Sequence, residues 1–200
     1  MSNYKFLPDP DIQGNEESYA WWDNGLSNDE LETIKNYGGK QIALNATVGE
    51  DAYAPDVRRS KVSWIQHNQE TAWLYDRLAY IARMVNGQYF QFDLHGFNED
   101  FQYTVYEESN EGHYDWHIDR GYKKGNGSAP RKLSLVVQLS DPSEYEGGDL
   151  ELQYGNGTRV VEKKKGLVHV FPSWVLHRVT PVTKGTRCSL VVWACGPKFR

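Results

Sequence analysis

The second half of the chain consists of short segments whose pattern predicts β-strands. From about residue 90 onward, runs rich in Val, Thr and aromatic residues alternate with Gly, Pro, Asn and Asp, as antiparallel strands do. In the run Lys132–Leu139, four apolar residues at odd positions share one face of the expected strand. Similar runs lie at 149–154, 166–171, 175–180 and 187–194. Many short strands favour a sandwich or jelly roll.

Two helices are expected ahead of these strands. Ser27 and Glu30 form a capping box that predicts the start of a short helix, which should end near Gly38. A longer helix is expected from about residue 68 to 85, where apolar residues recur at helical spacing. Its apolar stripe comprises Leu74, Leu78, Ile81 and Val85. We therefore predict a mainly β fold in which N-terminal helices pack on one sheet.

Length and composition favour one domain. The chain has 200 residues and no internal repeat, so we expect a single domain over residues 1–200. Residues 1–95 would form a supporting region of helices and strands, and residues 96–200 the β core. The free thiols Cys188 and Cys195 are expected to be buried, because their spacing fits neither a metal motif nor a disulfide framework.

Charge and hydropathy exclude several classes of protein. No apolar run is long enough to span a bilayer, and the first residues lack the basic and apolar stretches of a secretory signal. We therefore expect no membrane partner and a cytoplasmic location. The net charge is −5, from 22 Lys and Arg against 27 Asp and Glu, which disfavours nucleic acid as a partner. We expect a monomer or a weak homo-oligomer.

Two overlapping His-x-Asp motifs carry the first sign of chemistry. His113 precedes Asp115 and His117 precedes Asp119, and each pair would place imidazole and carboxylate on the same side of a strand. An iron site that keeps three positions open uses two histidines and one carboxylate, so it needs a second, distant histidine. The candidates for that histidine are His177 and His169.

The position of a nearby arginine allows a choice between these two histidines. A dicarboxylate cosubstrate needs a buried cation near the metal. Arg187 follows His177 across the expected turn 181–185, so two neighbouring antiparallel strands would present both side chains to one interior. His169 is followed by Arg178, but no hairpin turn joins them. We therefore favour His177. His169, His113, His95 and His67 are expected to be structural.

These motifs resemble the 2-oxoglutarate- and Fe(II)-dependent oxygenases, specifically their prolyl 4-hydroxylase-like branch. The resemblance covers roughly residues 101–200 and implies a double-stranded β-helix, the jelly roll of that family. The matching blocks are Gly112–Asp119, Arg131–Ser134, Gln138–Ser140, Glu146–Leu150, Phe171–Val182 and Gly185–Arg187, together with Tyr106 and Trp193.

The resemblance also implies roles for individual residues. His117, Asp119 and His177 would hold Fe(II), and Arg187 would pair with the distal carboxylate of 2-oxoglutarate, with O₂ as second cosubstrate and ascorbate as reductant. Further residues expected around the cosubstrate are Tyr106, Gln138, Leu150, Val179 and Trp193. Gln138 stands where some members have a tyrosine that binds the same carboxylate.

Several functions remain open at this point. We expect hydroxylation of a prolyl residue in a peptide or protein, across a rim formed by Tyr53, Arg58, Arg131 and Trp174, with the loops 50–59 and 121–128 as covers. A hydroxylase of a small molecule or free amino acid, or a jelly roll that binds metal or ligand without turnover, would share the motifs. Nucleic-acid demethylases of this superfamily usually carry a second arginine where Trp193 stands.

Overall fold

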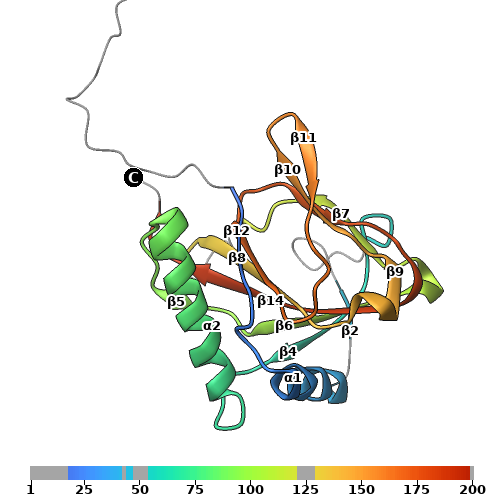
Figure 1. Ribbon diagram of the computed structural model, residues 1–200, viewed down its shortest axis with the longest axis horizontal. Coiled ribbons are helices and arrows are strands. Elements are labelled where there is room, and N and C mark those ends of the chain that lie inside the picture. Colours follow the sequence, from blue (N-terminus) through green and yellow to red (C-terminus); the bar gives the residue numbers. More distant parts are fainter. Residues whose placement is uncertain (1–17, 42–43, 47–53, 121–128, 199–200) are drawn as a thin grey trace, which may run out of the picture.

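The computed structural model describes residues 18–41, 44–46, 54–120 and 129–198, in which two helices flank two antiparallel sheets. Figure 1 shows helix α2 (Ala72–Val85) beside the larger sheet and the hairpin of β10 (Leu150–Tyr154) and β11 (Gly157–Val160) extending from the body. The larger sheet runs in the order β1 (Ala20–Trp22), β12 (Val168–Pro172), β8 (Arg131–Gln138), β14 (Val182–Cys195), β6 (Phe101–Glu107), β4 (Lys61–Ile65) and β2 (Leu44–Asn45), with β5 (Gly96–Phe97) and β9 (Tyr145–Gly147) also paired to β14. The smaller sheet runs in the order β11, β10, β13 (His177–Val179), β7 (His113–His117) and β3 (Arg58–Arg59).

Both predicted helices are confirmed, with shifted ends. Helix α1 (Asn28–Lys40) begins at the expected capping box, in which the Ser27 hydroxyl accepts from the Glu30 N–H and the Glu30 carboxylate accepts from the Ser27 N–H. Helix α2 starts at Ala72 rather than near residue 68, because Asn68 and Thr71 close a polar turn on each other's backbone N–H groups. It continues as a π-helical turn, Asn86–Phe90.

The helices cover the outer face of the larger sheet, as predicted. The odd-numbered apolar residues of β8 pack against the apolar stripes of both helices in one core. That core includes Leu31, Ile34, Leu74, Leu78, Ile81 and Val85 from the helices and Leu133, Leu135 and Val137 from β8. The other face of β8 turns toward the smaller sheet, where Val136 packs in a second core with Tyr106 and Phe171.

One predicted connection is wrong. We expected His177 and Arg187 on neighbouring antiparallel strands joined by a hairpin, but β13 belongs to the smaller sheet and β14 to the larger one. His177 pairs with His117 and Leu152, whereas Arg187 pairs with Tyr106. The chain crosses between the sheets after Val179, so the two residues come from different sheets instead of neighbouring strands.

Strands from before residue 95 belong to both sheets. Strands β1, β2 and β4 extend the larger sheet and β3 extends the smaller one, so the N-terminal region contributes to both layers. No helix in the described part of the chain has the length and apolar character needed to cross a bilayer.

Candidate active site

Three side chains from the smaller sheet and the segment after β7 converge on one point. His117 ends β7, His177 begins β13 directly opposite it, and Asp119 follows two residues after His117. One ligand atom from each lies within 4.8 Å of the others. The Nε2 atoms of His117 and His177 lie 3.7 and 3.6 Å from the two Asp119 carboxylate oxygens. No other such group of three or more His, Cys, Asp or Glu occurs among the described residues.

Backbone carbonyls determine which imidazole nitrogens face this point. His117 Nδ1 lies 2.7 Å from the Asp115 carbonyl oxygen, and His177 Nδ1 lies 2.8 Å from that of Val175. A carbonyl only accepts, so both Nδ1 atoms carry a proton and both Nε2 atoms face Asp119. Burial lowers the pKa of His117 to about 4, and His177 contributes in the same direction, so the ring is neutral at pH 7.

The Asp119 carboxylate is held ionised in a buried position. Burial would raise its pKa, but the neighbouring His177 and His117 and a 2.7 Å hydrogen bond from the Ser134 hydroxyl lower it to about 2. The indole N–H of Trp193 favours the ionised form as well, although it reaches no acceptor within hydrogen-bonding geometry among the described residues. Two imidazoles and one carboxylate that converge on one point are a donor set that suits Fe(II) with positions left open.

A stack that sequence reasoning missed supports His117. The Tyr114 ring lies against the His117 ring with centroids 3.5 Å apart and an angle of 15°, and the Arg58 guanidinium lies 4.5 Å from the Tyr114 ring centre. Residues three apart on a regular strand point to opposite faces. Here the register between β7 and β13 shifts, pairing His177 with His117 but Val179 with Tyr114. A strict alternation pattern could not reveal this stack.

A buried cation lies in the same interior, on the larger sheet. Arg187 is 2% exposed, and its guanidinium makes one hydrogen bond, 3.5 Å to the Ser189 hydroxyl, besides its contact with Tyr145. It lies 5.4 Å from the ring centre of Tyr106. No carboxylate in the part of the chain that the structure describes pairs with Arg187. A buried guanidinium without a counter-charge suits an anionic ligand.

Comparison with known proteins agrees with this geometry. Residues 101–195 match the family model of the 2OG-Fe(II) oxygenase superfamily. This segment is a 2OG-Fe(II) oxygenase domain. A PKHD-type hydroxylase of Stutzerimonas stutzeri is 40% identical over 85 residues, which are 41% of this chain and 38% of that protein. One from Synechococcus sp. is 36% identical over 92 residues, 46% of this chain and 40% of that protein. The chain thus spans about two fifths of the curated relatives it matches.

Solved structures share the fold of the oxygenase domain. A Pseudomonas putida prolyl-4-hydroxylase superposes with a TM-score of 0.72 at 19% identity, over 92% of this chain and 95% of that one. A Trichoplax adhaerens prolyl hydroxylase, in complex with a peptide fragment of the hypoxia inducible factor oxygen degradation domain, gives 0.72 at 18% identity over 89% and 83%. A viral collagen prolyl hydroxylase from Paramecium Bursaria Chlorella virus-1 gives 0.68 at 20% over 90% and 97%. The jelly-roll fold is thereby confirmed.

The other residues predicted to surround the cosubstrate lie in the interior between the sheets. Leu150 and Val179 are buried partners across β10 and β13. Trp193 is buried opposite Ser134, close to Asp119. The Gln138 amide nitrogen already donates to the Tyr145 hydroxyl at 2.8 Å and to the Ser140 carbonyl at 3.3 Å. It is therefore not free to donate to a cosubstrate. The sequence pattern gave no signal for Tyr145.

Two residues of the expected substrate rim, Arg131 and Arg58, make polar contacts within the protein. The Arg131 guanidinium pairs with Glu99, lies 3.6 Å from the Trp193 ring centre and donates to the Asp119 carbonyl at 3.2 Å. The guanidinium of Arg58 is buried, with hydrogen bonds of 2.9 Å to both Ser60 and Gln102. Arg131 therefore uses all three guanidinium nitrogens in contacts within the protein, and Arg58 uses Nε and Nη2.

The other rim elements are distributed differently. Trp174, on the segment between β12 and β13, is 37% exposed and packs on Phe92. Tyr53 and the loop 121–128 lie outside the described residues, as does the first part of the loop 50–59. Among the other histidines, His169 is buried with its Nδ1 2.9 Å from the Tyr19 hydroxyl, and His113 contacts the Glu111 carbonyl. These two contacts agree with structural roles.

Proposed function

We propose that the chain is a 2-oxoglutarate- and Fe(II)-dependent dioxygenase that hydroxylates an unactivated C–H bond. One observation carries this proposal. A His-Asp-His donor set and the buried Arg187, which pairs with no carboxylate among the described residues, face the same interior from opposite sheets. Bound Fe(II) with 2-oxoglutarate and O₂ supplies an oxidative decarboxylation that yields succinate, CO₂ and a hydroxylated substrate.

His117, Asp119 and His177 would hold the Fe(II). The carbonyls of Asp115 and Val175 hold a proton on each Nδ1 and leave each Nε2 as the nitrogen that would bind the metal. The Ser134 hydroxyl occupies one lone pair of Asp119 Oδ2 and thereby orients the carboxylate.

Arg187 would hold the distal carboxylate of 2-oxoglutarate. Its charge faces an interior lined by Tyr106, Leu150 and Val179, where a carboxylate loses its water and gains strongly from a guanidinium. The apolar walls would exclude water from the reaction. Tyr106 and Trp193 would complete the pocket, the first beside Arg187 and the second beside Asp119.

For the substrate we propose a prolyl residue in a peptide or protein. Support comes from exposed apolar side chains next in sequence to the proposed ligands: Ile118, between two of them, is 49% exposed, and Leu176, just before the third, is 39% exposed. Solved structures with this fold include prolyl hydroxylases, one of them with a bound peptide. A proline-containing segment suits a shallow apolar rim because its φ is already fixed. Ascorbate is proposed as reductant.

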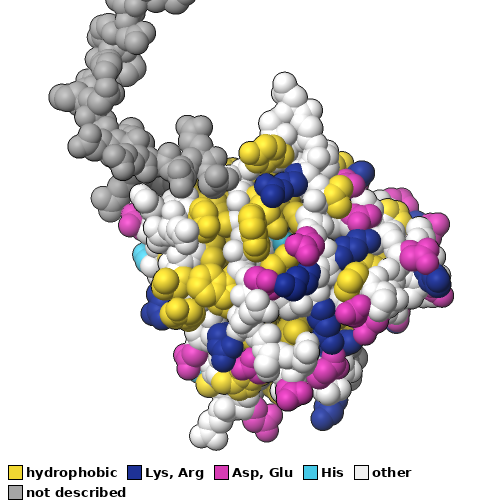
Figure 2. Space-filling model, in the orientation of Figure 1, with side chains coloured by type: hydrophobic (Ala, Val, Ile, Leu, Met, Phe, Trp, Pro, Cys, Tyr) yellow, Lys and Arg dark blue, Asp and Glu magenta, His cyan; other side chains and the backbone are white. Residues whose placement is uncertain are grey.

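Nucleic acid is not proposed as a partner. The face of the molecule drawn in Figure 2 intersperses Lys and Arg with Asp and Glu, and the net charge is −5. A phosphate backbone is bound by concentrated positive charge, so this distribution favours a peptide or small molecule.

The test is succinate formation from 2-oxoglutarate by the full chain with Fe(II), with proline-containing peptides compared with free proline and other amino acids. Peptide-dependent succinate and a peptide gaining one oxygen on a proline ring would support both parts of the proposal. Turnover with small molecules only would reject the prolyl substrate and keep the dioxygenase. Tight metal and 2-oxoglutarate binding without any turnover would favour a binding module. His177→Ala, which removes a proposed ligand, is the inactive control.

A further inference from the structure

We propose that the Tyr145 hydroxyl is a second anchor for the distal carboxylate of the cosubstrate, beside Arg187, and that Gln138 positions it. This inference rests on the proposed function and deepens it, because the family resemblance leaves the position of Gln138 without its usual tyrosine. The structure supplies a tyrosine from a different element, strand β9, at the same place in the interior.

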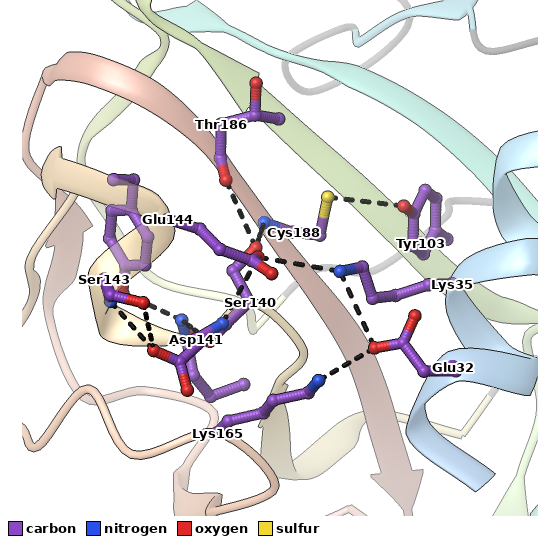
Figure 3. Close-up of polar contacts among 12 residues, drawn as sticks. Glu32, Lys35, Tyr103, Ser140, Asp141, Ser143, Glu144, Lys165, Thr186 and Cys188 are labelled. Carbon is purple, nitrogen blue, oxygen red and sulfur yellow. Dashed lines mark hydrogen bonds and ion pairs between the residues drawn. The ribbon is translucent and has the colours of Figure 1, made fainter. Parts of the chain in front are cut away.

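Tyr145 is fixed from its backbone side by a polar network. Figure 3 shows Ser140, Asp141, Ser143 and Glu144 in the turn that leads into β9, and Lys35 reaching it from α1. The Asp141 carboxylate caps the short 3₁₀ turn Pro142–Glu144.

Ser140 ties this turn to β14, because its hydroxyl donates to the Thr186 carbonyl at 3.2 Å and accepts from the Cys188 N–H at 2.8 Å. The backbone of Tyr145 then pairs with Gly185, two residues before Arg187. The tyrosine is therefore positioned relative to the arginine by contacts within the protein.

The Tyr145 ring is buried between Arg187 and Lys163. A Cβ on Gly148 would lie 3.1 Å from Arg187 Cδ and 3.3 Å from Tyr145 Cε2, so the glycine admits both side chains to one point. Gly148 has a φ of +59°, which favours glycine there on backbone grounds too. Lys163 Nζ lies 4.9 Å from the ring centre and is itself held by Asp149 at 3.0 Å.

Hydrogen-bond accounting leaves the Tyr145 O–H without an acceptor. The Gln138 amide nitrogen lies 3.3 Å from the Ser140 carbonyl, which can only accept, so this end of the amide is the NH₂ group. The same NH₂ lies 2.8 Å from the Tyr145 oxygen and donates to it. Arg187 also lies against this hydroxyl, and a guanidinium has donors only.

The Gln138 NH₂ donates to the Tyr145 oxygen and the Arg187 guanidinium lies beside it, so the proton of the hydroxyl points elsewhere. No acceptor for that proton occurs among the residues that the structure describes. A buried O–H next to a buried guanidinium, both lacking an anionic partner, is a donor pair that fits one carboxylate. The burial of Tyr145 raises the pKa of its hydroxyl despite Arg187, so the group is a donor at neutral pH.

The experiment compares two ligands that differ only at the distal end. 2-Oxoglutarate and 2-oxopentanoate share the 1-carboxylate and the 2-oxo group, but only the first carries a distal carboxylate. Their affinities for the full chain loaded with Mn(II), which avoids turnover, would be measured by calorimetry for the parent protein and for Tyr145→Phe. We expect Tyr145→Phe to weaken 2-oxoglutarate binding roughly ten- to a hundredfold and 2-oxopentanoate binding less than about twofold.

Tyr103→Phe is the matched control. Tyr103 is equally buried and its hydroxyl donates to Cys188, but it packs in the outer core, so its loss should change neither affinity. Gln138→Met tests the positioning role: it should weaken 2-oxoglutarate binding when Tyr145 is present and have no further effect in Tyr145→Phe. A merely structural effect of Gln138 would be the same in both backgrounds.

Three outcomes would overturn the inference. Unchanged 2-oxoglutarate affinity in folded Tyr145→Phe, or an equal loss for both acids, rejects the anchor while the proposed function stands. If the metal-loaded parent protein binds no 2-oxoglutarate, the proposed function fails and the anchor fails with it. Should Tyr145→Phe not fold, the Gln138→Met effect on the two ligands decides by the same criterion.

Discussion

Replacing Arg187 with methionine should have two opposite effects. It should raise the stability of the cosubstrate-free protein and weaken its binding of the cosubstrate. The guanidinium is 2% exposed, with a 3.5 Å contact to Ser189, the neighbouring Tyr145 hydroxyl and the Tyr106 ring at 5.4 Å. A binding site for an anion has to keep this charge in an unfavourable place until the anion arrives. The substitution removes the charge and keeps a side chain of similar length.

The magnitude follows from the contacts. Burying a charge still costs several kcal/mol after relaxation. A good hydrogen bond to a charged group returns about 1.5–3 kcal/mol. The 3.5 Å contact with Ser189 is beyond the usual range and returns little, and the contact with the Tyr145 hydroxyl returns part of that amount. The ring contact adds about 1 kcal/mol. We therefore expect Arg187→Met to raise the unfolding free energy of the metal-free protein by about 1–3 kcal/mol. Cosubstrate affinity should fall at least a hundredfold, or about 3 kcal/mol.

Urea unfolding of the metal-free protein measures the first effect and calorimetry with 2-oxoglutarate the second. The denaturation midpoint should rise at unchanged m-value, and the melting temperature by roughly 2–4 °C per kcal/mol. Arg187→Lys keeps the charge and should show no such gain. If Arg187→Met is instead less stable than the parent at equal m-value, the guanidinium is satisfied within the protein and the reasoning is refuted.

Three further predictions concern a proposed metal ligand, the residue Glu99 that holds Arg131, and the buried His169. His177→Ala should reduce Mn(II) affinity more than a hundredfold, measured by metal titration, because one of three proposed ligands is lost. Glu99→Gln should reduce it roughly tenfold, because Glu99 holds the Arg131 guanidinium that hydrogen-bonds the Asp119 carbonyl. Burial, with Arg187 nearby, lowers the pKa of His169 to about 3. The unfolded state therefore binds a proton that the folded state does not, and stability should fall from pH 6.5 downward by up to about 1.4 kcal/mol per pH unit. His169→Gln should flatten that slope in urea titrations.

Each of these has a result that contradicts it. Unchanged metal affinity in folded His177→Ala would move the site elsewhere. A Glu99→Gln variant with parental affinity would show that Arg131 does not hold the ligand segment. An unchanged slope between pH 6.5 and pH 4 in His169→Gln would assign the acid sensitivity to other groups.

Periodicity predicted local structure well and spatial arrangement less well. The alternation in 132–139 identified the apolar face of β8 correctly, and the stripe from Leu74 to Val85 identified the buried face of α2. Periodicity reports which residues share a face and is silent on which sheet a strand joins. For that reason the crossing between β13 and β14 was predicted as a hairpin.

The same distinction applies to the candidate site, where some residues could be predicted from the sequence and others could not. His117, Asp119 and His177 followed from a motif and a resemblance, and the structure brings them together; their role as ligands stays a prediction. Tyr114 and Tyr145 were missed, because one depends on a register shift and the other on an element that approaches from elsewhere in the fold. The expected cytoplasmic location and association state also stay predictions.

The separation of the proposed metal ligands and the cation onto different sheets gives the cosubstrate a mechanical role. A molecule bound to both would cross-link two layers that are otherwise joined by side-chain packing and chain connections. Strands β13 and β7 have three and five residues, so the smaller sheet has few backbone hydrogen bonds to resist local opening. Ligand occupancy should therefore slow amide hydrogen exchange mainly in β7 and β13, by a factor that grows in proportion to cosubstrate concentration above its dissociation constant.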